Sequence, residues 1–288
     1  MQSLVPRGLL HYPDRKVKYP NGDSYFHESG FMEQANQELN KRVKQANQAI
    51  YNNLSASEYN RNESIFNERR RSACDSILLE TVKNSGNESF LDLGTGTGNL
   101  LRLAQQHFKC CIGLDIGERL LQQIKDDFPS CHLVSGDVEA LPFPSGQFNC
   151  VSCYAVLHHL ALHEQLFREC FRVLKPGGCF YTDHDPNYFF SRYYRLYYRL
   201  RFQNRHGFGS EDGDLAEYHN VFTDGLNPET LRSLLLYIGF RKVKIYYRLS
   251  DRERWGPLEG LAFKLLSLGA RLSNWRSFHT HFALLAHK

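Results

Sequence analysis

Short apolar runs alternate with longer amphipathic stretches along residues 88–185. Runs of this length are typical of buried strands, and we predict strands at 89–93, 110–115, 131–137, 148–155 and 177–185. The stretches between them carry apolar residues at helical spacing. We therefore predict helices at 99–108, 118–128 and 163–174.

The order of these elements indicates how the strands run. Strands separated by helix-length segments require right-handed crossovers, which produce a parallel sheet. Several of the runs lack polar alternation, as is typical of strands covered on both faces by helices. The pattern therefore predicts an α/β protein.

The N-terminal part has a different pattern. Residues 1–30 carry many turn formers and are interpreted as an arm, and residues 31–50 predict a helix of modest amphipathicity. Helical spacing resumes at 67–82, just before the first strand. We therefore separate an N-terminal arm with helices, 1–65, from a main domain, 66–288.

A long insert rich in Tyr, Phe and Arg interrupts the alternation at 186–220. Its arginines recur at helical spacing among tyrosines over 188–205, which leaves four interpretations. It is an ordinary amphipathic helix, an aromatic lid over an acceptor, an interfacial helix in peripheral contact with a membrane, or a segment whose aromatic rings stack on single-stranded nucleic acid. After the insert we predict a helix at 227–240 capped by Asn227, a strand at 241–249, a helix at 259–272 and a strand at 278–288.

Charge and cysteine usage narrow the class of protein. A net charge of +4 over 288 residues is mild, and we expect no nucleic-acid partner. No apolar run approaches the ~20 residues that span a bilayer, and the N-terminus lacks the apolar core of a secretory signal. Most of the eight cysteines fall in or beside predicted strands, where a free thiol behaves as a small buried hydrophobe. We therefore expect a cytoplasmic protein without disulfides.

Cys150 and Cys153 form a C-x-x-C pair within a predicted strand. Residues three apart on a strand point to opposite faces of the sheet, so these two thiols do not converge. We therefore expect no metal or redox site.

Three glycines follow the first predicted strand at alternate positions, Gly94, Gly96 and Gly98. A loop without side chains lets a ligand lie against the main chain where the strand turns into a helix. A phosphate-binding P-loop would need a lysine that is absent here, and a dinucleotide-binding loop would need glycine at Asn99. The loop alone does not separate the remaining ligand classes.

Two acids follow the next two strands. Asp115 stands where a carboxylate accepts both hydroxyls of an adenosine ribose, and Asp137 stands where one can accept from an adenine amino group. Besides the glycine loop and these two acids, the sequence contains VLKPGGCFY, a helix end followed by a Pro-Gly-Gly turn and a strand.

With these blocks the chain resembles a class I S-adenosylmethionine-dependent methyltransferase of the type 11 small-molecule group. The motifs that carry the resemblance are LDLGTGTG, GLDIGERLL, GDVEALPFPSGQFNCVSCYAVLHHL and LKPGGCF. The resemblance implies a Rossmann-like sheet of seven strands, mostly parallel with an antiparallel last strand, and helices on both faces. It also implies S-adenosyl-L-methionine as cofactor and S-adenosyl-L-homocysteine as product.

The resemblance also assigns cofactor-binding roles. Asp92 and the loop through Gly94, Thr95, Gly96 and Gly98 would hold the methionine part. Asp115 would hold the ribose and Ile116 would pack on the adenine. Asp137 and Val138 would contact the adenine edge, and Cys153 and Tyr154 would line the methyl-donor pocket. Tyr51, Tyr59 and Arg70 are weaker candidates for the cofactor carboxylate.

Methyl transfer to a hydroxyl or a carbon acid is helped by a base. Our candidates are His184, whose pKa we expect the neighbouring Asp183 and Asp185 to raise, and His219 at the end of the insert. Each is alternatively a polar anchor for the lid. His158 and His159 are interpreted as helix capping or pocket-shaping residues.

The acceptor is expected to be a small or lipid-linked molecule methylated on O, N or C. The alternatives are a protein or nucleic-acid methyltransferase, a non-catalytic scaffold that binds S-adenosylmethionine, and a nicotinamide-dependent reductase. The sequence does not indicate the oligomeric state.

Overall fold

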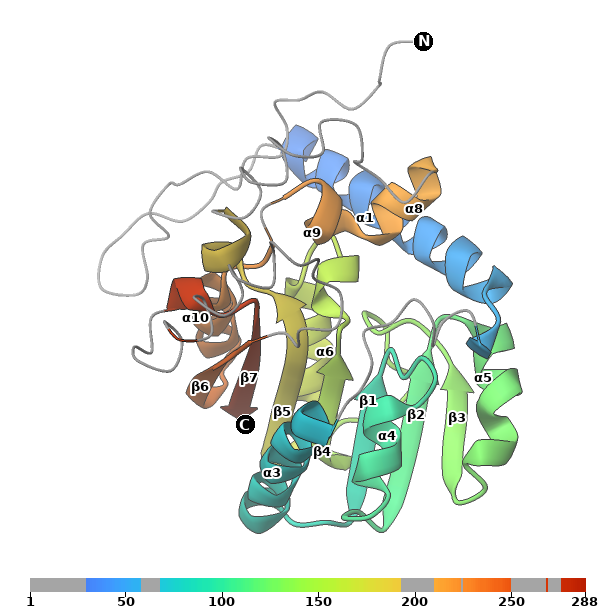
Figure 1. Ribbon diagram of the computed structural model, residues 1–288, viewed down its shortest axis with the longest axis vertical. Coiled ribbons are helices and arrows are strands. Elements are labelled where there is room, and N and C mark those ends of the chain that lie inside the picture. The colour runs from blue at the N-terminus through green and yellow to red at the C-terminus, as the bar shows by residue number, and fades with distance from the viewer. Residues whose placement is uncertain (1–29, 58–67, 193–209, 224, 250–267, 269–275) are drawn as a thin grey trace.

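The computed structural model describes residues 30–57, 68–192, 210–223, 225–249, 268 and 276–288. These residues form a twisted sheet with helices on both faces and a helical cap above one edge (Figure 1). The helix predicted at 259–272 and most of the segment 188–205 lie outside the described residues.

The sheet has seven strands in the order β3-β2-β1-β4-β5-β7-β6. β7 runs opposite to the other six strands, so the predicted Rossmann-like arrangement is confirmed. The strands are β1 (Ser89–Leu93), β2 (Cys110–Asp115), β3 (Cys131–Ser135), β4 (Phe148–Tyr154), β5 (Leu174–Pro186), β6 (Arg241–Arg248) and β7 (His281–His287).

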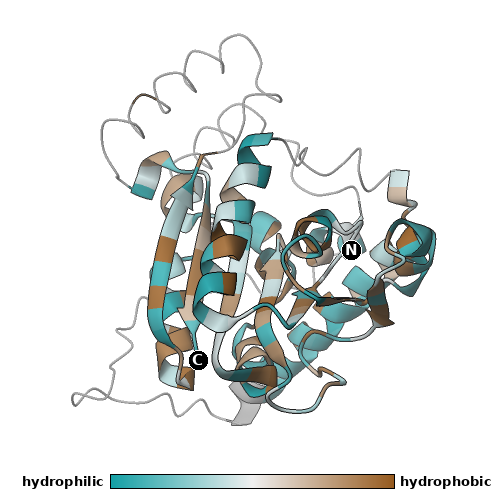
Figure 2. Cartoon of the chain, turned by 90° about the horizontal axis from the view of Figure 1, so that it is seen from below, coloured by the Kyte–Doolittle hydropathy of each residue, from teal (hydrophilic) through white to brown (hydrophobic). Residues whose placement is uncertain are grey.

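Two apolar layers sandwich the sheet. On one face, the strands pack against α3 (Glu68–Ser85), α4 (Asn99–Ala104) and α5 (Glu118–Ile124). On the other, they pack against α6 (Glu164–Val173) and α10 (Pro228–Ile238). Apolar residues follow the strands and recur on the helices that cover them (Figure 2). Burial on both faces explains why the strands read as continuous apolar runs.

The cysteines fit this arrangement. Cys150 belongs to one apolar layer and Cys153 to the other, as expected for residues three apart on a strand. All eight cysteines are free thiols. Burial raises the pKa of the Cys150 and Cys153 thiols well above the usual value, so neither of these two is a reactive thiolate.

Element ends differ from the prediction by a few residues. The helix predicted at 99–108 ends at Ala104, and the one predicted at 118–128 ends at Ile124 and continues as a 3-10 turn, η1 (Lys125–Asp127). The cap of α10 is as predicted, because the side chain of Asn227 accepts a hydrogen bond of 3.0 Å from the backbone N–H of Glu229.

A helical cap lies over the carboxyl ends of the parallel strands. It consists of α1 (Gly30–Asn53), α8 (Glu211–Ala216) and α9 (Tyr218–Val221), with α1 running across the top of the molecule beside α8 (Figure 1). A third apolar cluster joins these helices to the loop after β4. Its buried members are Val43, Ala46, Ala161, Leu215 and Tyr218. The N-terminal helix is thus packed on the main domain.

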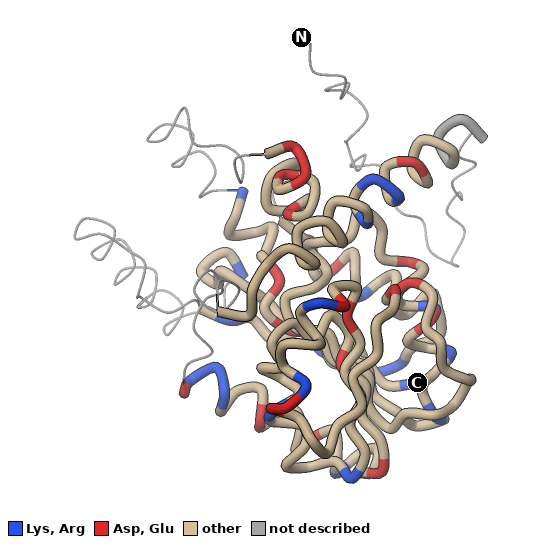
Figure 3. Tube along the Cα trace, turned by 90° about the vertical axis from the view of Figure 1, so that its right-hand side faces the viewer, with Lys and Arg blue, Asp and Glu red and all other residues tan. Residues whose placement is uncertain are grey.

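Charges of both signs are interspersed over the described part of the chain (Figure 3). Among the described residues, no helix is both long enough and apolar enough to span a bilayer.

Candidate active site

A pocket with about 620 Å³ of empty volume, partly open to solvent, lies between the cap and the carboxyl ends of the strands. Its walls come from the loops after β1, β2, β3 and β4 and from one side of α1. The lining residues are Lys44, Asn47, Tyr51, Gly94, Asp115, Ile116, Asp137, Val138, Ala155, Val156, His159 and Leu160. Open α/β sheets bind their ligands at this edge.

The loop after β1 needs glycine for two physical reasons. Gly94, Gly96 and Gly98 have φ angles of 62°, 54° and 80°, which side chains disfavour. A Cβ at Gly94 would also lie 2.5 Å from a methyl of Val156, and one at Gly98 would lie 2.2 Å from the Phe128 ring. Only Gly94 of the three lines the pocket, so the other two shape the turn beneath it.

Asp115 holds this loop to the end of β2. Its carboxylate accepts hydrogen bonds of 2.8 Å from the backbone N–H groups of Gly96 and Gly117. The residue is 7 % exposed, and burial raises the pKa of its carboxyl group. Since each carboxylate oxygen has two lone pairs, both oxygens can still accept from a ligand hydroxyl.

Asp92 lies below the pocket rather than on its wall. It is 2 % exposed and accepts hydrogen bonds from the hydroxyls of Thr95, at 2.6 Å, and Ser152, at 2.8 Å. Burial raises the pKa of Asp92 to about 6. Asp92 and Thr95 therefore support the glycine loop from inside.

The turn after β3 is tied to the N-terminal helix. Val138 lines the pocket, while the Asp137 carboxylate accepts from the backbone N–H of Glu139 at 2.8 Å and from Lys44 Nζ at 2.7 Å. Lys44 also pairs with Glu139 at 2.6 Å. Asp137 thus reaches the pocket with one cationic partner already in place.

Sequence reasoning missed Lys44 and Asn47 and named Tyr51 only as a weaker candidate. The three residues occur at positions that share one face of a helix, which is the signal that could have found them. Arg70 is not among the residues that line the pocket, and Tyr59 lies outside the described residues.

The end of β4 contributes different residues from those predicted. Cys153 is fully buried against the layer that contains α6, because strand alternation turns it away from the pocket. The Tyr154 ring stacks on His184, with 5.2 Å between ring centroids. Ala155, at a φ of 57°, and Val156 line the pocket instead. Cys153 and Tyr154, predicted as lining residues, are thus not among the residues that line this pocket.

His184 occupies an irregularity between β5 and β7 with a φ of 70°. Its ring also stacks on His281, with 4.1 Å between centroids. Burial is the main cause that lowers the pKa of His184 well below its usual value, and the positive charge of Arg70 lowers it further. The expected rise in this pKa is wrong.

The neighbouring acids do not raise the His184 pKa because their side chains have other partners. Asp183 accepts a hydrogen bond of 2.7 Å from the Tyr181 hydroxyl, and Asp185 accepts one of 2.9 Å from the imidazole of His158. Burial raises the pKa of both carboxyl groups.

His219 is 2 % exposed and is not among the residues that line the pocket. Its Nδ1 is 3.0 Å from the Thr223 hydroxyl, and its ring lies 5.2 Å from that of His163. Burial lowers its pKa well below the usual value. Neither His184 nor His219, the two predicted bases, is among the residues that line the pocket.

His159 is the histidine among the lining residues. It lies on a 3-10 turn after β4, η2 (Leu157–His159), with its Nδ1 2.6 Å from the carbonyl oxygen of Ala216. Its Nε2 lies 3.4 Å from the Tyr51 hydroxyl. This contact joins the turn to α1 across the top of the pocket.

The sequence of this chain is similar to those of known methyltransferases. Residues 91–182 match a family described as a methyltransferase domain. A demethylmenaquinone methyltransferase of Staphylococcus saprophyticus is 27% identical over 216 residues, which are 72% of this chain and 92% of that protein. A 37.1 kDa transposon protein of Streptomyces fradiae is 32% identical over 109 residues, which are 36% of this chain and only 32% of that protein.

Solved structures show the same fold. A SAM dependent methyltransferase from Archaeoglobus fulgidus superposes with a TM-score of 0.50 at 20% identity, over 76% of this chain and 94% of that one. At this identity the likeness concerns the fold alone.

Proposed function

We propose that this chain, which is a class I S-adenosylmethionine-dependent methyltransferase of the type 11 group, methylates a small, largely apolar acceptor that carries a ring hydroxyl. The observation that carries the proposal is the pocket itself. Its acceptor side is walled by Val156 and Leu160 and covered by α1, so a small apolar ring is enclosed better than a polymer.

The cofactor site fits S-adenosylmethionine. The glycine loop presents bare backbone, and a Cβ at Gly94 would fill the cradle. We propose that Asp115 accepts from the ribose hydroxyls, that Ile116 and Val138 enclose the adenine, and that Asp137 lies at its edge. When bound, the cofactor supplies an activated methyl group on a sulfonium.

The residues of this chain have two tasks in the transfer. They orient the acceptor in line with the donor, and they exclude water from the reacting atoms. We assign the second task to α1, because Lys44, Asn47 and Tyr51 close the pocket from the side opposite the sheet. We place the acceptor hydroxyl beside His159, the histidine on the wall.

The ring acceptor is suggested by the relative that aligns over nearly its whole length. That protein acts on demethylmenaquinone, and 92% of it matches this chain. An isoprenoid quinol has the features that the pocket calls for, a flat apolar ring with hydroxyl oxygens.

The test is methyl transfer from labelled S-adenosylmethionine to a panel of acceptors. The panel holds a reduced naphthoquinone with a short prenyl chain, simple phenols, phosphoethanolamine, RNA and a protein extract. We expect label on the quinol and on the smaller phenols. Label on RNA, protein or phosphoethanolamine, with none on the ring acceptors, would contradict the proposal. Calorimetry should show that S-adenosylhomocysteine binds and that NADH does not.

A further inference from the structure

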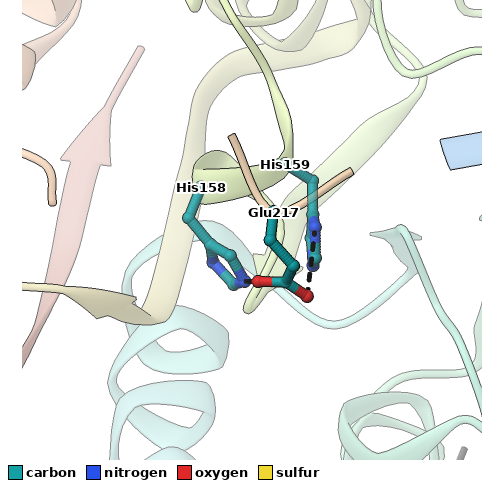
Figure 4. Close-up of side chains that lie close together, drawn as sticks. All are labelled: His158, His159 and Glu217. Carbon is teal, nitrogen blue, oxygen red and sulfur yellow. Dashed lines mark ion pairs between the residues drawn. The ribbon is translucent and has the colours of Figure 1, made fainter. Parts of the chain in front are cut away.

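Three side chains with metal-binding atoms meet beside the pocket. They are His158 and His159 of η2 and Glu217, which precedes α9, and one ligand atom of each lies within 4.8 Å of the others. The two imidazoles stand on either side of the carboxylate (Figure 4). Of the residues that the structure describes, this is the group that combines three such atoms.

The three groups approach one another without forming hydrogen bonds. His158 Nε2 is 3.7 Å from one Glu217 oxygen, and His159 Nδ1 is 3.9 Å from the other. Both distances exceed the range of a hydrogen bond, which ends near 3.2 Å for N–H···O. Ligand atoms around a tetrahedral or octahedral ion are separated by roughly 3.0–3.4 Å when its bonds are about 2.1 Å long. The three ligand atoms lie within 4.8 Å of one another, so side-chain rotations that shorten these separations are needed for them to bind one ion.

Both histidines are held by their Nδ1 atoms. His158 Nδ1 lies 2.9 Å from Asp185, whose carboxylate is fully buried, and His159 Nδ1 lies 2.6 Å from the Ala216 carbonyl oxygen. With the protons on these Nδ1 atoms, the Nε2 lone pair of His158 faces Glu217. The Nε2 lone pair of His159 faces the Tyr51 hydroxyl at 3.4 Å, so an ion bound by His159 replaces that contact. Metal-binding histidines are oriented in this way, through a hydrogen bond from the other ring nitrogen to a carboxylate or a carbonyl.

Glu217 has its own support and remains reachable. Its Oε2 accepts a hydrogen bond of 2.7 Å from the Asn220 amide. The side chains of His158, His159 and Glu217 are 10 %, 15 % and 19 % exposed, which leaves an ion a route from solvent. Glu217 supplies negative charge to a divalent cation.

We propose that His158, His159 and Glu217 form a binding site for one divalent transition-metal ion. Two imidazoles and one carboxylate suit Zn²⁺, Fe²⁺, Co²⁺ or Ni²⁺, whereas Mg²⁺ and Ca²⁺ prefer oxygen ligands. Three protein ligands leave coordination positions open. Because His159 also lines the pocket, an ion at this site lies next to the place proposed for the acceptor hydroxyl, a consequence that rests on the proposed function.

The test is titration of the purified full chain with Co²⁺, followed by its visible absorption, and with Zn²⁺ by calorimetry. We expect one ion per chain and a saturable Co²⁺ spectrum, with Mg²⁺ failing to compete. Glu217→Gln keeps the size and the carbonyl that faces Asn220, and it should weaken Zn²⁺ binding at least about tenfold and abolish the spectrum. Asp185→Asn alters the support of His158 and the hydrogen bond from the Thr182 hydroxyl, and it should weaken binding by about ten- to a hundredfold.

His107→Ala is the matched control, because His107 forms a comparable pair with Asp75, at 2.6 Å, away from the site. It should leave the Co²⁺ spectrum unchanged. A Glu217→Gln variant with wild-type Zn²⁺ affinity and spectrum would overturn the proposal, as would a wild-type chain without a saturable Co²⁺ signal. Binding of S-adenosylhomocysteine is measured on the same samples, so loss of the cofactor site is distinguished from loss of the metal site.

Discussion

Lys44 of α1 lies 2.7 Å from Asp137 and 2.6 Å from Glu139, so one ammonium group joins the N-terminal helix to the turn after β3. Glu139 is 4 % exposed, and its carboxylate also accepts a hydrogen bond from the side-chain amide of Asn40, which lies on α1 as well. The cap is thus attached to the loop after β3 by partly buried ion pairs of one lysine with two acids.

Lys44→Met tests this attachment. It leaves two acids without their cation, one of them buried, so we expect the free energy of unfolding to fall by about 1–3 kcal/mol. Urea titration measures this loss, and limited proteolysis should cut α1 faster. Lys41→Met is the control, because Lys41 is exposed on the same helix. Equal stability of both variants would show that the pair does not hold the cap.

Asp115→Ala should weaken S-adenosylhomocysteine binding by about 1.5–3 kcal/mol, the scale of lost charge-assisted hydrogen bonds. The loss has two sources, since the variant lacks the acceptor proposed for the ribose and also the acceptor for the Gly96 and Gly117 amides. Calorimetry gives the affinity, and Asp127→Ala serves as control because Asp127 is 61% exposed. An unchanged affinity would remove Asp115 from the cofactor site.

Gly98→Ala separates crowding from backbone strain. The new methyl group would lie 2.2 Å from the Phe128 ring at a φ of 80°. The control is Gly177→Ala, with a similar φ of 77° and nothing within 4 Å. We expect Gly177→Ala to cost about 1–2 kcal/mol from strain alone and Gly98→Ala to cost at least 1–3 kcal/mol more, both by urea unfolding. Similar losses would mean that Phe128 moves aside freely.

The pH dependence of stability should carry a signature of Asp92. Burial raises its folded-state pKa to about 6 from an ordinary 3.8, so the folded state keeps a proton that the unfolded state has lost. Its contribution is therefore present below about pH 4 and is lost as the pH rises through 6. Asp92→Asn should gain about 2–3 kcal/mol relative to the wild type between pH 4 and pH 7.5, by urea unfolding without cofactor. Parallel stability curves would contradict the assignment.

Local pattern was sufficient to predict the sheet and the loop after β1. The strands could be predicted from continuous apolar runs because both faces of the sheet are buried. The glycine loop could be predicted because the need for glycine comes from the local backbone conformation and not from distant residues. Helix ends were less predictable, because the turns at Ala104 and Ile124 carry no glycine or proline to mark them.

The rest of the site depends on contacts between distant parts of the chain. Lys44 and Asp137 are 93 residues apart, and no local pattern pairs them. The pKa of His184 was predicted with the wrong sign because sequence adjacency suggested carboxylate neighbours. The irregularity in β5 instead brings His281, from the far end of the chain, against its ring.

The position of β7 has a consequence for how the molecule is assembled. β7 lies between β5 and β6 in the sheet, although it comes after both of them in the chain. The strand that pairs with β6 is β7, so β6 cannot join the sheet until β7 is in place. Cys179 of β5 and His287 of β7, which pair with each other in the sheet, are 108 residues apart. Pairing residues so far apart in the chain has a high entropic cost and is slow. We therefore expect β1 to β5 to form first and the pairing of β7 with β5 and β6 to form in the last kinetic phase of folding.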